Sequence, residues 1–333
     1  MSRALDIRPP MVIVSSVIRS ADQGQSHGGV YLVDLSTGLA EQVIDWNTSK
    51  IDWEGRGGDR GLRGIAFHGD RLYLAASDEI FAYDRGFAPL GSFRNRYLRH
   101  CHEIFVSGDR LFMTSTGFDS VLEYDLLSDR FVRGYLLRYG EILKARRRLG
   151  IRPRPTFRTF DPEAEGGPSP ADTSHINSVT SDGSSLFVSG VNMGTLWQIR
   201  EDRLGRYAKI PYGTHNARPF REGVLLNHTA TDRIAYVDRG GALLLSYPIK
   251  RYADEELEHA ELPQDKARQA FGRGLAVLSD EAFVGGSSPA TVTLYRFDPS
   301  EVLASTSISK DVRNAVHGLE IWPFGGSSGD GSA

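Results

Sequence analysis

The fold of this chain is readable in residues 214–229, which run THNARPFREGVLLNHT. If His215 is numbered offset zero, the same ungapped frame recurs from Arg63, His102, His175 and Arg273. Each copy has an acidic residue at offset seven and a small hydroxyl residue at offset fourteen. These positions are Asp70, Asp109, Asp182, Glu222 and Asp280, and Ser77, Thr116, Ser189, Thr229 and Ser287. A sixth start occurs at His317, so the chain repeats one structural unit.

Each repeat has the pattern of a small antiparallel sheet. In the copy that starts at Arg63, apolar residues 64–67 lead into a Gly-Asp turn, and residues 71–76, 79–84 and 90–93 follow as three further strands. Short strands joined by turns and repeated at intervals of about 40 residues are typical of a β-propeller. The six starts therefore predict an all-β fold, a six-bladed β-propeller.

The two ends of the sequence complement each other. The last start has an inner strand and no strands after it, whereas residues 11–15, 30–34 and 41–44 form three strands with no inner strand before them. Together they predict one closing blade, which leaves no open sheet edge in the ring. We therefore predict one propeller domain over residues 1–324 and a disordered Gly/Ser-rich tail over residues 325–333.

Two long intervals between repeats indicate insertions, at residues 138–172 and 248–271. Within them, residues 142–149 and 254–259 are compatible with short helices, and residues 16–28 form a further long loop. In a four-stranded blade all three segments emerge on the same face of the ring. Long loops gathered at one place are more often functional than accidental.

The bulk composition excludes several classes of protein. The 333 residues are 40% hydrophobic with a net charge of −3, so nucleic acid is not an expected partner. The single cysteine, Cys101, excludes an internal disulfide framework. The apolar run at residues 11–17 is broken by Ser15 and Ser16 and is too short for a signal peptide or a membrane span. We therefore predict a cytoplasmic protein with no membrane partner.

The residues at offset zero carry the main functional signal. In order around the ring they are His317, Arg63, His102, His175, His215 and Arg273, and they are expected to surround the axis on the elaborated face. Converging neutral imidazoles are good transition-metal ligands. The predicted metal ligands are His102, His175, His215 and His317, with Fe(II) favoured over Cu or Zn. A site of three histidines without His317, and a metal-free polar channel bridged by water, are the alternatives.

Other residues near the same mouth predict a substrate. Arg63 and Arg273 are suited to holding a carboxylate or phosphate, so we predict a small anionic substrate, with Asn216 as a further binding residue. His228, at offset thirteen, is the predicted catalytic acid or base, although such a histidine is often only a packing residue. The candidates for orienting the histidine rings are Glu103, Asn177, Asn216 and Glu320.

The repeated frame, in residues 175–178 (HINS) and 215–219 (HNARP), resembles the broad six-bladed propeller group of the gluconolactonase and strictosidine synthase-like proteins. That resemblance implies the fold. Gluconolactonase-type proteins hold a divalent ion through Glu, Asn and Asp, where this sequence has His or Arg. The four histidines look similar in kind to the axial iron ligands of carotenoid oxygenases, which are seven-bladed.

These observations lead to a prediction about activity. We predict a metal-dependent enzyme, an oxidoreductase or oxygenase, that acts on a small anionic substrate held by the arginines. A zinc-type hydrolase or lyase and a non-catalytic ligand- or protein-binding propeller are the alternatives, because a propeller fold by itself does not assign a reaction.

Overall fold

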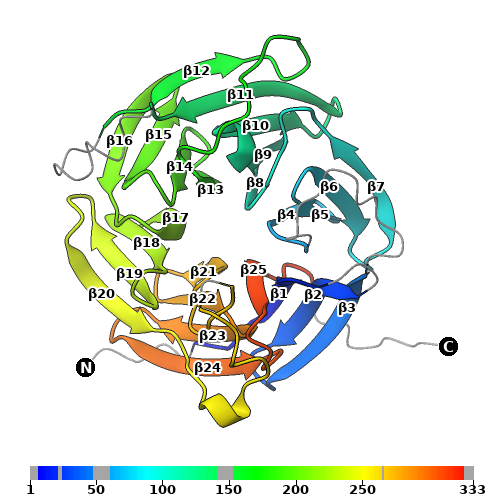
Figure 1. Cartoon of the computed structure of the whole chain (residues 1–333), viewed down its shortest axis with the longest axis vertical. Helices are drawn as coiled ribbons and strands as arrows, with labels where there is room; N and C mark the ends of the chain where they lie inside the picture. The colour runs from blue at the N-terminus through cyan, green and yellow to red at the C-terminus, as the bar shows by residue number, and fades with distance from the viewer. Residues whose placement is uncertain (1–6, 22–24, 48–60, 141–152, 265, 326–333) are drawn as a thin grey trace.

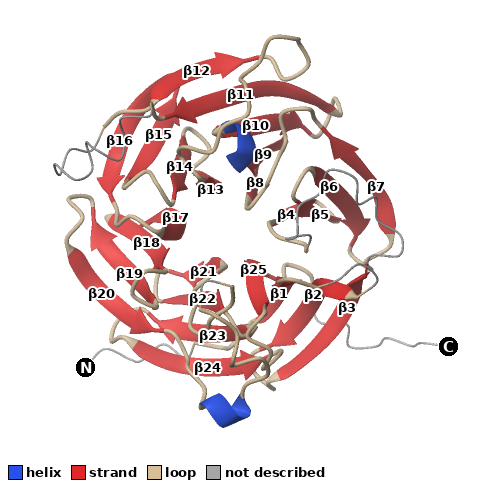
Figure 2. Ribbon diagram, in the orientation of Figure 1, coloured by secondary structure: helices blue, strands red, loops and turns tan. Residues whose placement is uncertain are grey.

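Six antiparallel sheets surround a central axis in the computed structural model, which describes residues 7–21, 25–47, 61–140, 153–264 and 266–325 (Figure 1). Almost all regular structure in the described residues is strand (Figure 2). The predicted all-β, six-bladed propeller is confirmed.

Five of the blades are made of consecutive strands, from the axis outward. The first two blades contain β4 (Ile65–His68), β5 (Arg71–Ala76), β6 (Glu79–Asp84) and β7 (Pro89–Arg94), and then β8 (Ile104–Ser107), β9 (Arg110–Ser115), β10 (Ser120–Asp125), β11 (Arg130–Arg138) and β12 (Thr156–Phe160). The next three contain β13 (Ile176–Ser181), β14 (Leu186–Gly190), β15 (Thr195–Arg200) and β16 (Arg203–Lys209); β17 (Thr214–Phe220), β18 (Gly223–His228), β19 (Arg233–Asp238) and β20 (Leu243–Pro248); and β21 (Leu275–Ser279), β22 (Ala282–Ser287), β23 (Thr291–Arg296) and β24 (Glu301–Ser307).

The closing blade joins the two ends of the described chain, as predicted. Its strand order is β25 (Asn314–Ile321), β1 (Met11–Ile18), β2 (Ser26–Asp34) and β3 (Leu39–Asn47). The buried Ser15 hydroxyl accepts a hydrogen bond from Gly318 N at 2.8 Å and donates one to the carbonyl of Arg63 in the next blade. This serine therefore links the closure of the ring to a residue at the mouth of the channel.

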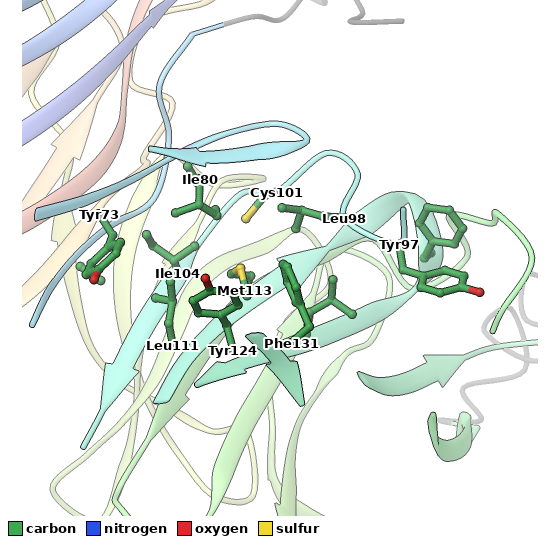
Figure 3. Packing of buried hydrophobic residues seen from close by; sticks show 14 residues of the cluster. Tyr73, Ile80, Tyr97, Leu98, Cys101, Ile104, Leu111, Met113, Tyr124 and Phe131 are labelled. Carbon is green, nitrogen blue, oxygen red and sulfur yellow. The ribbon is translucent and has the colours of Figure 1, made fainter. Parts of the chain in front are cut away.

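The hydrophobic core lies between neighbouring blades. Figure 3 shows one such cluster, in which Tyr73 and Ile80 of the first blade pack with Ile104, Leu111 and Met113 of the second. Burying apolar surface of this kind is worth roughly 25 cal/mol per Å² and holds adjacent sheets together. Cys101 belongs to this cluster, and burial raises the pKa of its thiol to about 12. The Cys101 thiol is thus part of the core.

The loops of the elaborated face differ from the prediction in three places. A strand that the sequence did not predict, β12, adds a fifth strand to the second blade, where Phe160 packs edge-on against Tyr97 at 5.3 Å. In place of a helix over residues 254–259, the structure has the 3₁₀ turn η3 (Asp254–Glu256) and an isolated β-bridge from Glu258 to Asp311. The loop at 16–28 is shorter than predicted because β1 continues to Ile18 and β2 begins at Ser26.

Some predictions cannot be compared with the structure. The helix expected at residues 142–149 and the tail after residue 325 lie outside the described residues.

The second 3₁₀ turn, η2 (Thr116–Phe118), lies between β9 and β10. Within the described part of the chain, no helix is long and apolar enough to cross a membrane. The cytoplasmic location stays a prediction.

Candidate functional site

The six offset-zero residues lie just before or within the inner strands, and several of them are in contact around the axis. We call their end of the channel the upper mouth. The rings of His102 and His175, from neighbouring blades, have centroids 5.6 Å apart. Arg273 Nη1 lies 3.4 Å from His102 Nδ1. The repeat therefore identified side chains that converge in space.

Arg273 places a positive charge at this mouth. It precedes β21, and its partner His102 precedes β8, which belongs to the blade directly opposite in the ring (Figure 1). Because the two residues come from opposite blades, their side chains meet inside the channel, and the guanidinium group of Arg273 lies within it.

Burial and the arginines together hold the histidines in the neutral form. The pKa values of His102, His215 and His317 are well below the usual 6.5, first because burial disfavours the charged ring and then because Arg273 or Arg63 repels a proton. His215 and His317 are each 5% exposed. Within the described residues, the Nε2 atoms of both rings have no hydrogen-bond partner. Two neutral imidazoles thus offer uncommitted nitrogen atoms inside the channel.

The predicted metal site is not confirmed. Within the described residues, no group of three or more His, Cys, Asp or Glu side chains is arranged to hold a metal ion. The guanidinium of Arg273, which lies beside His102, would also repel a cation there. The likeness to the four-histidine iron site of carotenoid oxygenases therefore has no support.

A cluster of cations surrounds Phe271 beside the ring. The guanidinium carbons of Arg19, Arg268 and Arg273 lie 5.3, 4.9 and 5.2 Å from the centroid of its ring, and the His215 ring packs edge-on at 5.7 Å. Arg268 is also paired with Asp232. Arg19 and Phe271 were not predicted, because both lie outside the repeated frame and no pattern in the sequence indicates their position.

His175 is a partly exposed member of the ring and is paired with a carboxylate. Its side chain is 33% exposed, and its Nδ1 lies 3.0 Å from a carboxylate oxygen of Asp172. The preceding residues are held by the buried Asp119, which accepts hydrogen bonds from the backbone N–H groups of Thr173 and Ser174 at 2.9 and 2.8 Å. His175 itself has a left-handed backbone, with φ of 49°. This anchor directs the segment toward the mouth.

In what we call the lower half of the channel, two carboxylates share one arginine. Arg218 Nη2 lies 3.7 Å from Glu103 Oε1 and 3.9 Å from Glu320 Oε1. Burial raises the pKa of Glu103, and burial with repulsion from Glu103 raises the pKa of Glu320 to about 7, while Arg218 opposes both shifts. The expectation that Glu103 and Glu320 orient the histidines is therefore replaced by a pairing with Arg218.

Asn216 connects three blades through its side chain. Its Oδ1 accepts hydrogen bonds from Gly274 N at 3.1 Å and from Asn227 Nδ2 at 3.0 Å, and its Nδ2 donates to Glu103 Oε1 at 3.4 Å. The left-handed backbone of Asn216, with φ of 50°, coincides with a register shift in β17 and turns the side chain toward these partners. The amide predicted to bind substrate is thus engaged by the protein itself.

A small cavity is lined by two of the ring histidines and by the two carboxylates. Its volume is about 10 Å³, which is close to the space that one water molecule needs. The side chains that line it belong to both halves of the channel: His102, Glu103, Asn216, His317 and Glu320. The cavity therefore joins the neutral imidazoles to the carboxylate pair.

The remaining predicted residues, His228 and Asn177, are not in hydrogen-bond contact with the ring side chains within the described part of the chain. His228 is the last residue of the second strand β18, and within the described residues its ring makes no hydrogen bond or ion pair with the six ring residues. Burial lowers its pKa. Asn177 Nδ2 donates to the carbonyl of Thr214 at 3.1 Å and so links two blades. The catalytic role of His228 stays a prediction.

Comparisons with known proteins identify the fold and nothing finer. No family model matches the chain, and no curated protein matches it. A solved nidogen/laminin complex matches with a TM-score of 0.55 at 9% identity, over 93% of this chain and 97% of that one. At this identity we infer the propeller fold alone.

Two lyase structures are also similar in part. A streptogramin B lyase matches with a TM-score of 0.46 at 13% identity, and a catalytically inactive virginiamycin B lyase from Staphylococcus aureus with quinupristin matches with 0.44 at 9%. Each match covers 75% of this chain and 70% of the other. These partial matches assign no function to this chain.

Proposed function

We propose that this propeller binds a small anionic molecule at the upper mouth of its channel, on the guanidinium group of Arg273. The contact that supports the proposal is the 3.4 Å approach of Arg273 to His102 across the ring, because it fixes a permanent positive charge inside the channel. Arg63, which is 2% exposed, adds a second guanidinium that acts on the same histidines. Guanidinium groups bind carboxylate and phosphate oxygens with paired, charge-assisted hydrogen bonds.

The histidines complement this charge. A neutral imidazole donates a hydrogen bond from one ring nitrogen and accepts one at the other, and the Nε2 atoms of His215 and His317 are uncommitted within the described residues. A bound anion offsets the charge of the arginines, so it raises the pKa of a nearby imidazole. The site that results binds an anion and has histidines suited to acid–base chemistry on it.

Sulfate is a suitable probe because it stays doubly charged across the pH range in which histidine titrates. We expect calorimetric titration to show sulfate binding to the wild-type protein and a loss of at least about tenfold in affinity for Arg273→Gln, since a hydrogen bond to a charged group is worth about 1.5–3 kcal/mol. Arg239→Gln is the matched control, because Arg239 is 55% exposed and lies over Tyr207 away from the mouth. Equal affinity of the wild type and Arg273→Gln would refute the proposal.

The metal-dependent oxidative reaction predicted from the sequence is a second candidate function. The observation in its favour is the pair of buried, uncommitted Nε2 atoms of His215 and His317. It requires the Arg273 side chain to move away, because the guanidinium now lies beside His102. The residues that would hold the ion are His102, His175 and His215, with or without His317.

Elemental analysis of protein purified without a histidine tag tests this second candidate. Under it, the wild type contains about one equivalent of iron, copper or zinc, and Arg273→Ala contains at least as much. If neither protein contains a transition metal, even after anaerobic reconstitution with iron, the metal-dependent function is wrong.

A further inference from the structure

The lower half of the channel contains charged groups that anion binding at the mouth does not use. Glu103 and Glu320 share the single guanidinium of Arg218, at 3.7 and 3.9 Å. Glu103 also accepts hydrogen bonds from Val179 N at 3.3 Å and Asn216 Nδ2 at 3.4 Å. Within the described residues, the carboxylate of Glu320 has its ion pair with Arg218 and no hydrogen-bond donor from the backbone. One cation does not neutralise two carboxylates, so Glu320 is the carboxylate that is less well compensated.

The small cavity connects this pair to the anion site. Glu103 and Glu320 line the same cavity as His102 and His317. His317 is 5% exposed, and its Nε2 has no partner within the described residues. A volume of about 10 Å³ admits about one water molecule. A buried water bonded to a carboxylate and an imidazole satisfies both groups and forms a short path for a proton.

We propose that Glu320 donates and accepts a proton for the anion site, through one water in the cavity that passes the proton to and from His317. In the forward direction the O–H bond of Glu320 breaks and an N–H bond forms at His317 Nε2, while the water gives up one proton as it gains another. The products are a carboxylate and an imidazolium, and no further reactant is consumed. This inference rests on the proposed function, because the bound anion is what stabilises the imidazolium.

The charges around each group set the direction of transfer. His317 is surrounded by Arg19, Arg63, Arg273, His102 and His215, and Glu320 by Glu103 and Arg218. In the empty site, burial and the arginines keep the pKa of His317 low, and burial with Glu103 raises that of Glu320 to about 7. The proton therefore resides on Glu320. An anion bound to Arg273 shifts it toward His317, which then becomes a proton donor at the mouth.

Nuclear magnetic resonance of protein with labelled glutamate carboxyl and histidine ring atoms tests the proposal in two parts. Without anion, we expect one glutamate carboxyl that titrates at about 7 and is missing in Glu320→Gln. With saturating sulfate near pH 6.5, we expect the His317 ring to gain imidazolium character in the wild type and to lose more than about half of that gain in Glu320→Gln, because the carboxylate no longer forms. Glu222→Gln is the control, since Glu222 is 97% exposed.

The two proposals fail in different ways. A Glu320 carboxyl that titrates below about 5, near the ordinary value of glutamate, would overturn the proton site whether or not sulfate binds. Equal protonation of His317 in the wild type and in Glu320→Gln would overturn the transfer. Failure of sulfate to bind any of the three proteins would contradict the anion site, and with it the delivery of a proton to that site.

Discussion

In the upper half of the channel the ionisable groups are arginines and neutral histidines, whereas in the lower half two carboxylates share Arg218. The inner strands and the residues directly before them supply both halves, so the blades do not determine the chemistry. Burial acts on both in the same direction, against charge: it lowers the pKa of His317 and raises the pKa of Glu320. The two halves therefore respond to pH with opposite signs, and the comparison can be tested by changing one half at a time.

The largest effect is expected from Arg218→Met, which leaves Glu103 and Glu320 without their cation. Removing one partner of a buried ion pair destabilises a protein strongly, and for this partly exposed group we expect a loss of about 2–4 kcal/mol in the free energy of unfolding at pH 8. The loss should shrink as the pH falls, because the carboxylates take up protons. Urea unfolding at pH 8 and pH 5 measures it, with Arg239→Met as control. A loss that is the same at both values would contradict the account of the lower half.

Glu320→Gln should have a smaller effect of opposite sign. A carboxyl whose pKa is raised in the folded state binds a proton there more readily than in the unfolded chain. Ionising Glu320 therefore lowers the free energy of unfolding, and this loss is absent below the unfolded pKa and develops as the pH rises to about 7. We expect the variant to be more stable than the wild type by about 1–2 kcal/mol at pH 8 and equal to it near pH 4. Thermal unfolding across this range checks the sign. A variant less stable at pH 8 would show that ionised Glu320 is stabilised by Arg218.

His317→Gln tests the upper half, where stability is expected to fall as the pH is lowered. The folded pKa of His317 is lowered, so below about 6.5 the unfolded chain binds a proton that the folded protein does not, and stability falls with pH. Between pH 7.5 and pH 5.5, the variant should lose about 1 kcal/mol less than the wild type in the free energy of unfolding. Equal losses would mean that His317 is protonated in the folded protein.

Asp172→Asn should have the smallest effect. Asp172 and His175 are 44% and 33% exposed, and an exposed pair of this kind contributes about 0–1 kcal/mol. We expect a change within about 0.5 kcal/mol, further reduced at high salt. A larger loss by urea unfolding would show that this pair, rather than Asp119, anchors the segment before His175.

The sequence was sufficient for the fold because the repeat has a fixed register. The hydroxyl residue at offset fourteen is buried in every copy, and the hydroxyls of Thr116 and Thr229 donate hydrogen bonds to backbone carbonyls. The repeat therefore marks positions that the blade itself requires. The closing blade followed from the complementary ends. Strand β12 did not, because it lies outside the frame and pairs only at the outer edge.

The candidate site was predicted only in part. The frame located the six ring residues, since equivalent positions of the inner strands converge. It gave no information on how far a long side chain reaches, so the crossing of Arg273 to His102 was missed and a metal was predicted on the axis. Strand alternation also fails where the backbone of Asn216 is left-handed. One signal was overlooked: Arg218 and Glu320 both stand at offset three, with opposite charges, and they are paired.

The most direct test of the anion site is a crystal structure with selenate, located by the anomalous scattering of selenium. The account predicts a selenium peak at the upper mouth, with selenate oxygens within hydrogen-bond distance of the Arg273 guanidinium and of His215 or His317. A mouth without selenium at concentrations that fill other sites, or a metal ion bound by His102, His175 and His215 with Arg273 turned away from them, would contradict it.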